Sequence, residues 1–550
     1  MKPLNISIIT VFLITFLLIL SSGLFSCKKI TDPYKNSTGK DTITYDLLKT
    51  SIYVQFFDAS TNEVIIPEED KELKIQIVGK SKAGIADIVG LQRDEYIAKN
   101  GFITLGLLPD SEFTPSDGNP IRFSIIAQLT GYLTSRKEIS LTSEGDYLVK
   151  IFMVNINNPP SGIIIESVNN VGVLINGVLQ GAVSVDIPNN KAKLTIPSGT
   201  KLFDKDSTYL AGKLNISLIY YSGTDDLSLA NIPGGIVSSV LENNSVNPGV
   251  FSPTGIIAYN IYDSDWHKAY NIVDDSIEIS MVVSAQSYNP ISGLNVIDGD
   301  LTPVYSYIAD TGLWVLNQWV EITDTANGQL SATVKTQDLD YANFSWFKEN
   351  NCNQGAKFQI SGSCTQCNSV MLDGVIRKQD DNTFVSNISI AGYWDETLNI
   401  PLSTGGTGVY INWNESNNCN YCNVNPSVSP LLVDDMCSQQ LIELPLVNSS
   451  PTSISITANF YGMCPSDTNV LILPSFGLWI RPIDATCWRW SSMKNGVAQI
   501  CNVIYGERYV LGTYYDGNWK EWEITITEET VYDFTIDFSQ SVCTDVFGLL

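Results

Sequence analysis

Hydrophobic and polar residues alternate along most of the chain beyond residue 45. Every second residue is apolar in the segments 52–56, 73–77, 214–218, 277–281, 522–526 and 532–538. Successive side chains of a β-strand point to opposite faces, so this period predicts short, half-buried strands. Clusters of Gly, Pro, Asn and Asp separate the segments, and no amphipathic helical stretch of three turns is present. The pattern predicts an all-β protein made of antiparallel β-sandwich domains in series.

Three breaks in the pattern predict where one domain ends and the next begins. Residues 157–162 (NNPPSG) cannot continue a strand, because proline lacks the backbone N–H that a ladder needs. Further breaks lie near residues 348–354, where the cysteines begin, and near residues 445–451, in a Ser/Asn/Pro cluster. A chain of 550 residues is long enough for several domains. We expect them at 46–157, 160–349, 352–446 and 447–550.

The first 26 residues form a segment of their own. Lys2 precedes an apolar stretch over residues 8–20, and small residues then lead to Ser26 and Cys27. This order predicts a secretory signal peptide, since the apolar stretch is short for a membrane-spanning helix. Serine followed directly by cysteine resembles the lipobox of bacterial lipoproteins. The resemblance implies cleavage after residue 26, diacylation of Cys27, and a lipidated polar tether over residues 27–45. The alternatives are an ordinary signal peptide and an uncleaved N-terminal anchor.

The lipid would make the membrane the first partner of this protein. Lys28 stands where an aspartate marks inner-membrane retention in many lipoproteins, so by analogy we expect the outer membrane, at its periplasmic or its cell-surface face. The net charge of −26 would repel phosphate groups, which argues against nucleic acid as a partner. The remaining partner, a protein or a glycan, is not identified by the sequence.

Cysteine is confined to one part of the mature chain after Cys27. An even number in an exported protein predicts disulfides, five in this case. The alternative is zinc, because two CxxC pairs occur, although 51 residues separate them, more than is usual for a zinc ribbon. The ten residues are Cys352, Cys364, Cys367, Cys419, Cys422, Cys437, Cys464, Cys487, Cys501 and Cys543.

Two stretches resemble known families of surface domains. Residues 54–64, with residues 104–107 and 127–133, resemble the carboxypeptidase regulatory-like or transthyretin-like sandwiches that are common in Bacteroidetes surface proteins. Residues 194–200, 232–235, 251–255 and 303–315 resemble the β-sandwich of cartilage intermediate layer protein and its bacterial relatives. Both resemblances imply immunoglobulin-like or transthyretin-like domains without catalytic residues, in a Bacteroidetes-type surface lipoprotein.

The search for chemistry finds no catalytic set. His267 is the single histidine, and no nucleophile motif accompanies it, so we expect a surface loop. Asp298 and Asp300 are the strongest candidates for a weak Ca²⁺ site, and no other cofactor is expected. Adjacent acids are interpreted as surface charge, and they occur at 68–70, 225–226, 274–275, 380–381 and 434–435.

Aromatic residues crowd into positions 488–522 of the last domain. Most would form its core, and Tyr514, Tyr515 and Trp519, which flank an Asp-Gly turn, are the candidates for exposed residues that contact a glycan or a protein; the alternative for Trp519 is a core position. The leading hypothesis is a non-enzymatic interaction or scaffold protein. The alternatives are a glycan-binding surface lipoprotein that uses these aromatics, and a hydrolase that uses carboxylates hidden among the acid pairs.

Overall fold

A computed structural model describes residues 34–35, 40–45, 48–109, 111–116, 118–273, 275–308, 311–325, 327–349, 356–362, 369–393, 397–399, 408–413, 422–424, 428–437, 441–448, 453–528 and 530–549. The predicted signal peptide, Cys27, Cys352, Cys364, Cys367 and Cys419 lie outside these residues. Within them the fold is all-β, as the alternation predicted, and the α-helices are the short α2 (Asp226–Ala230) and α3 (Gln540–Asp545). No helix in the described ranges has the length and apolar character needed to cross a membrane.

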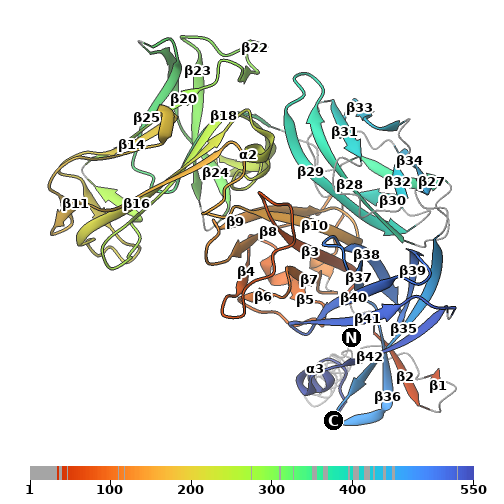
Figure 1. The fold of residues 1–550 in the computed structure, drawn as a ribbon. Coiled ribbons are helices and arrows are strands. Elements are labelled where there is room, and N and C mark those ends of the chain that lie inside the picture. The colour runs from red at the N-terminus through yellow and green to blue at the C-terminus, as the bar shows by residue number, and fades with distance from the viewer. Residues whose placement is uncertain are drawn as a thin grey trace, which may run out of the picture.

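The strands fall into four groups that follow the chain, which we call units (Figure 1). The N-terminal unit is a sandwich of two four-stranded sheets, ordered β10-β3-β7-β5 and β6-β4-β8-β9. Its core contains alternate residues of each strand, such as Ile52, Val54 and Phe56 of β3. Its strands are β3 (Thr50–Asp58), β4 (Leu73–Val78), β5 (Ile85–Asp87), β6 (Tyr96–Ala98), β7 (Phe102–Leu107), β8 (Ile121–Gln128), β9 (Ser135–Leu141) and β10 (Gly145–Met153).

The second unit is built around a 14-stranded sheet. In its β23–β24 hairpin, Tyr307 lies opposite Trp314, and Gly312 adopts a φ of +75° in the turn, a conformation that glycine accepts without strain. Its strands are β11 (Ile163–Ile175), β12 (Val178–Leu179), β13 (Val183–Asp186), β14 (Ala192–Ile196), β15 (Lys201–Phe203), β16 (Gly212–Ser222), β17 (Val237–Glu242), β18 (Ser245–Tyr262), β19 (Asn271–Val273), β20 (Ile277–Val283), β21 (Tyr288–Asn289), β22 (Leu294–Asn295), β23 (Leu301–Ile308), β24 (Leu313–Asp324), β25 (Leu330–Thr336) and β26 (Tyr341–Glu349).

The third unit pairs the sheets β30-β27-β34-β32 and β29-β28-β31-β33. Its strands are β27 (Lys357–Gly362), β28 (Ser369–Lys378), β29 (Phe384–Tyr393), β30 (Thr397–Asn399), β31 (Val409–Trp413), β32 (Cys422–Val424), β33 (Leu431–Val433) and β34 (Leu441–Asn448). The C-terminal unit contains β35 (Ile454–Cys464), β36 (Asp467–Pro474), β37 (Gly477–Pro482), β38 (Arg489–Lys494), β39 (Val497–Val503), β40 (Arg508–Tyr515), β41 (Asn518–Thr525), β42 (Val531–Asp537) and α3.

The sheets are mixed, although the sequence predicted antiparallel ones. In three units the first and the last strand are parallel neighbours, namely β3 with β10, β27 with β34, and β35 with β42. Parallel neighbours need a long crossover connection, and here the rest of the unit supplies it. The remaining strand pairs of these units are mostly antiparallel. The alternation along a strand is the same in both cases, so the sequence could not separate them.

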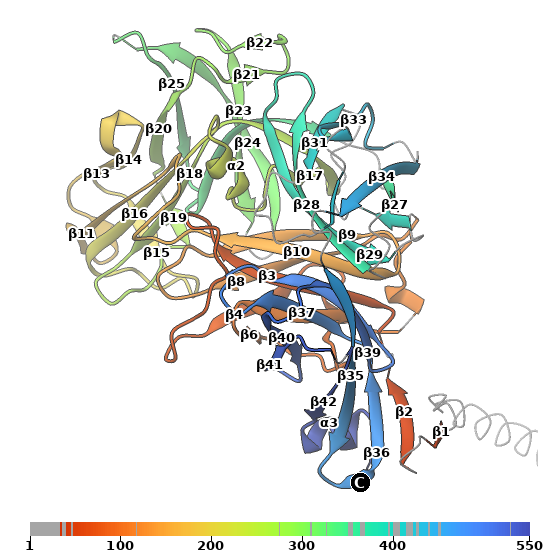
Figure 2. The ribbon, with the colours of Figure 1, turned by 45° about the vertical axis from the view of Figure 1, so that its right-hand side comes forward.

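The segment expected to be a free tether enters the fold. β2 (Asp41–Tyr45) pairs in parallel with β36 of the C-terminal unit, and β1 (Tyr34–Lys35) pairs with β2 (Figure 2). Tyr45 is buried and its ring meets that of Phe547 edge-on at 4.8 Å. The edge of β36 provides unpaired backbone groups, which explains why a polar segment with alternating Thr and Ile adds to it. The first and the last described strands, β1 and β42, therefore belong to the same sheet.

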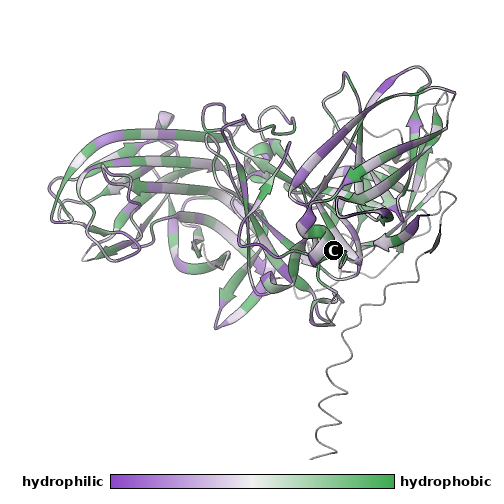
Figure 3. Cartoon of the chain, turned by 90° about the horizontal axis from the view of Figure 1, so that it is seen from below, coloured by the Kyte–Doolittle hydropathy of each residue, from purple (hydrophilic) through white to green (hydrophobic). Residues whose placement is uncertain are grey.

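The units pack around the N-terminal unit instead of lying end to end. Figure 3 shows hydrophobic and hydrophilic residues alternating along the long strands, as expected for half-buried sheets. In β3, however, both faces are buried. One face belongs to the core of the N-terminal unit, and the other meets the third and C-terminal units through Tyr53. This second face makes the contacts that bring the units together.

Candidate functional site

Two of the three aromatic residues expected to be exposed, Tyr514 and Trp519, pack against the N-terminal unit, and the third, Tyr515, lies in the core of the C-terminal unit. Tyr514 and Tyr515 are 2% and 6% exposed. Trp519 stacks on Phe102 of the N-terminal unit, with ring centroids 4.4 Å apart, and meets Trp488 edge-on at 5.5 Å. The expectation of an exposed aromatic platform at these residues is therefore corrected. The β40–β41 turn points toward the N-terminal unit, which covers the rings of Tyr514 and Trp519, whereas the Tyr515 ring packs on Phe476 and Phe538 of its own unit.

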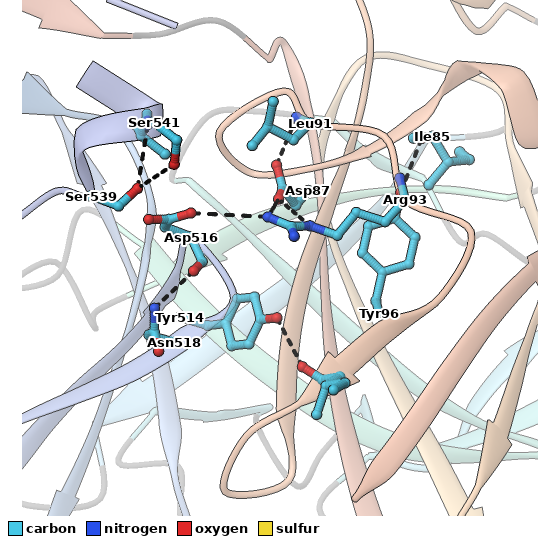
Figure 4. A network of polar contacts seen from close by, with 12 residues as sticks. Ile85, Asp87, Leu91, Arg93, Tyr96, Tyr514, Asp516, Asn518, Ser539 and Ser541 are labelled. Carbon is cyan, nitrogen blue, oxygen red and sulfur yellow. Dashed lines mark hydrogen bonds and ion pairs between the residues drawn. The ribbon is translucent and has the colours of Figure 1, made fainter. Parts of the chain in front are cut away.

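Polar contacts hold the same turn in place (Figure 4). The Tyr514 hydroxyl donates to the backbone oxygen of Ile97 at 2.9 Å. Arg93 lies between two carboxylates, 3.2 Å from Asp87 and 3.9 Å from Asp516. Burial raises the pKa of Asp87 and raises that of Tyr514 well above its ordinary value. This network fixes the C-terminal unit to the N-terminal unit, which is a structural role.

The described cysteines only partly follow the expectation of five disulfides. Cys464 and Cys543 form one, which joins β35 to α3. Cys437 and Cys487 are each disulfide-bonded. Cys501, by contrast, carries a buried thiol whose sulfur lies 3.8 Å from the backbone oxygen of Gln499. It packs into the core of the third unit as a small apolar side chain, a common environment for cysteine. The strand of Cys422 is described, but its side chain is not.

The other polar candidates have local structural partners. His267 is exposed and its Nδ1 lies 3.2 Å from Asp263, which also accepts the His267 backbone N–H. Asp298 accepts the backbone N–H of Asp324, and Asp300 that of Ile297. These contacts shape loops. In the part of the chain that the structure describes, no three His, Cys, Asp or Glu side chains are placed to hold a metal ion.

One adjacent acid pair, Asp225-Asp226, also has structural partners. The Asp225 carboxylate caps α2 by accepting the N–H of Ser228 at 3.0 Å. Asp226 forms an ion pair with Arg377 of the third unit. Both carboxylates are engaged in joining elements, so they give the hydrolase hypothesis no support.

A cavity of about 410 Å³ lies where all four units meet. Two sheets form its main walls, because the outer face of β3 and β10 lies against the outer face of β28 and β29. Pairs of residues along the first sheet are Tyr53 with Leu148, Gln55 with Lys150, and Phe57 with Phe152. Pairs along the second are Met371 with Ala391, Asp373 with Ser389, and Val375 with Asn387. The first pair of each sheet closes one end in a common apolar cluster, and the other two pairs line the cavity.

An ion pair spans the cavity wall. Lys150 Nζ lies 2.8 Å from Asp373 Oδ1, and the Ser389 hydroxyl donates to the same oxygen at 2.6 Å. The side chains of Lys150 and Asp373 are 15% and 6% exposed. Lys150 Nζ also lies 5.4 Å from the ring centroid of Phe57. Among the lining residues that the structure describes, these are the only charged side chains, and their charges cancel.

Several neutral polar groups of the cavity are left without protein partners. Gln55 is 1% exposed, and its Oε1 makes no hydrogen bond to a described residue. The side chains of Asn387 and Thr486 likewise find no partner among the residues that the structure describes. Apolar and aromatic walls with a few convergent polar groups, at a domain junction, are typical of small-molecule sites. This cavity is the candidate functional site.

The sequence did not identify this cavity, although two of its lining residues, Cys487 and Trp488, are singled out there as a disulfide candidate and as part of the aromatic-rich segment. The signal was weak but present, since Tyr53, Gln55 and Phe57 occupy the face of β3 that an isolated sandwich would expose to water. Two large aromatics on that face indicate a second buried surface. No signal in the sequence brings Lys150 together with Asp373, which is 223 positions away.

A second interface joins the N-terminal unit to the second unit beside the cavity. Ser239 donates to the Glu138 carboxylate at 3.1 Å, and Arg136 lies 5.3 Å from the ring centroid of Tyr307. Burial is the main cause that raises the pKa of Glu138, although its hydrogen bond and nearby arginines oppose the change. The ionised carboxylate is therefore less favourable in the fold than in water.

Neither a protein-family model nor a curated protein matches the chain. Solved structures with distant similarity are multi-domain, β-rich bacterial surface proteins. The Bacillus anthracis TIE protein is 9% identical, with a TM-score of 0.13, and the match covers 68% of this chain and 58% of that one. The pilus protein RrgB from Streptococcus pneumoniae is 8% identical over 90% and 99%, with a TM-score of 0.13. The pilus-presented adhesin Cpa is 8% identical over 72% and 98%, with a TM-score of 0.14. At such TM-scores the likeness carries no argument about fold or function.

Proposed function

We propose that this is a lipid-anchored, non-catalytic protein of the cell envelope that acts as an interaction or scaffold module. The observation that carries the proposal is the way β2 joins the C-terminal unit. Asp41 follows Cys27 by 14 positions, which span at most about 50 Å of extended chain. Because β2 is paired with β36, a lipid on Cys27 would hold the C-terminal unit close to the membrane.

The packing of the units supports a presenting role. The β21–β22 tip of the second unit lies at the opposite end of the molecule from β1 and β2 in both views. Buried clusters connect the N-terminal unit to the second, third and C-terminal units. A body joined in this way would hold the second unit away from the membrane, where Ile291 and Leu294 of the tip are 71% and 69% exposed. The alternative of a glycan-binding protein was based on Tyr514, Tyr515 and Trp519, and these residues are packed inside the protein.

Two experiments test the proposal. Replacing Cys27 with Ser should abolish labelling by a fatty-acid analogue and release the protein from the membrane fraction. Retention of the substituted protein in that fraction, with no label in either form, would refute the lipid anchor.

The second experiment tests orientation and partner contact. A photo-crosslinking amino acid is placed in intact cells at Ile291, in the tip, or at Asn469, an exposed position in β36. We expect a discrete protein adduct from Ile291 and lipid adducts from Asn469. Lipid adducts from Ile291 would reverse the orientation, and the absence of a protein adduct at both positions would contradict an interaction function.

A further inference from the structure

We propose that the cavity at the junction of the four units binds a small, uncharged, hydroxylated ring compound, that is, a monosaccharide or the end of an oligosaccharide. This goes beyond the proposed function and does not depend on it. It also involves none of the aromatic residues first suspected of contacting a glycan, because Tyr514, Tyr515 and Trp519 do not line this cavity.

The charge of the cavity argues for an uncharged ligand. Lys150 and Asp373 already satisfy each other at 2.8 Å in a largely buried position. An anion or a cation would have to separate this pair, which would leave one buried charge without its partner. A neutral ligand leaves the pair intact and can still form hydrogen bonds with it. Each of the described contacts of Asp373 uses Oδ1, so Oδ2 remains an acceptor for a hydroxyl.

The polar groups of the wall match hydroxyls. The amide of Asn387 and the hydroxyl of Thr486 both donate and accept hydrogen bonds, and neither is used by a described residue. A ligand hydroxyl also donates and accepts, so it can satisfy such groups in either sense. A purely apolar ligand would leave the buried Gln55 Oε1 unpaired and dry, which is unfavourable.

The remaining walls favour a ring with apolar faces. Phe57 and Phe152 stack with centroids 5.4 Å apart, and Trp488 is a third aromatic residue of the lining. The C–H faces of a sugar ring pack well on aromatic surfaces, while its edges present hydroxyls. Access is provided at the rim, where Asn62, Leu227 and Thr486 are exposed. The volume lies within the range usual for small-ligand pockets.

The test is calorimetric titration of the full, lipidated chain in detergent. The probes are glucose, galactose, mannose, N-acetylglucosamine and their common disaccharides, each up to about 10 mM. The charged counterparts are glucuronic acid and glucosamine. We expect at least one neutral sugar to bind with one site per chain, and its charged counterpart to bind at least about tenfold more weakly.

Two nearly isosteric variants locate the site. Asn387→Leu and Thr486→Val remove groups that have no described protein partner, so the melting temperature should stay the same. Each should weaken sugar binding about five- to tenfold, the loss of one hydrogen bond. The matched control is Asn295→Leu, an exposed asparagine in β22, which should bind as the parent does.

Three results would overturn the proposal. The sugar-binding proposal is wrong if no neutral sugar in the panel gives a heat of binding. It is also wrong if a charged counterpart binds as tightly as the neutral sugar or more tightly. Binding that survives both variants unchanged would place the site elsewhere. None of these results would affect the membrane anchor or the crosslinking at Ile291, so the two proposals fail separately.

Discussion

The Lys150–Asp373 pair provides the sharpest test of how the units are held together. At 2.8 Å and an effective dielectric constant of about 20, its gross attraction is about 6 kcal/mol, and removal of both charges from water offsets most of it. Removing one partner leaves the other charge in the wall. We expect Asp373→Leu and Lys150→Met each to lower the free energy of unfolding by about 3–4 kcal/mol.

The double variant should restore most of that loss. With both charges gone, Met and Leu of similar volume face each other across the two sheets, and stability should return to within about 1 kcal/mol of the parent. The measurement is urea unfolding followed by tryptophan fluorescence, because Trp488 lies in the same cavity wall. Amide exchange in β29 reports whether the loss is local to the junction.

The matched control is Arg508 with Glu523, a pair at 2.7 Å whose side chains are 57% and 61% exposed. Removing either partner there should cost less than about 1 kcal/mol, since water already solvates both charges. The reasoning fails if Asp373→Leu costs no more than this control. It also fails if the double variant loses the sum of the two single changes, because the charges would then act independently.

Three further predictions concern other contacts. Trp519→Ala should destabilise the protein by about 2–4 kcal/mol in thermal or urea unfolding, because the ring stacks on Phe102; an unchanged stability would mean that the ring is not packed there. Cys464→Ser should cost about 4–5 kcal/mol, the chain entropy of a bridge spanning 79 positions, and a loss below about 1 kcal/mol would contradict that account. Glu138→Gln should raise the melting temperature at pH 7–8 but not in acid. Because the fold raises the pKa of Glu138, the protonated carboxyl stabilises the folded state fully below the unfolded-state pKa. That stabilisation is lost as the pH rises through the folded-state pKa. A difference in melting temperature that does not depend on pH would refute burial as the cause of the raised pKa.

The local pattern was sufficient for the all-β class. Strand period depends on neighbouring residues, so the alternation around Ile52 or Ile279 specifies a strand and its apolar face wherever the chain places it. Turn residues such as Gly312 are local in the same way. The parallel pairing of β3 with β10 is not, because the same alternation suits either direction.

Each strand has one face toward the core of its own unit and one face away from it. Only the tertiary structure decided what covers the face that points away. The sequence shows Tyr514 and Trp519 beside a turn, a position that normally reaches solvent, and only the docking of the N-terminal unit covers them. Lys150 and Asp373 read as ordinary surface charges until two sheets bring them within 2.8 Å. Hydrophobic periodicity reports how each residue alternates with its neighbours along the chain. Contacts between units join residues hundreds of positions apart, and no periodicity records those, so the cavity and its chemistry were decided by the packing of the units.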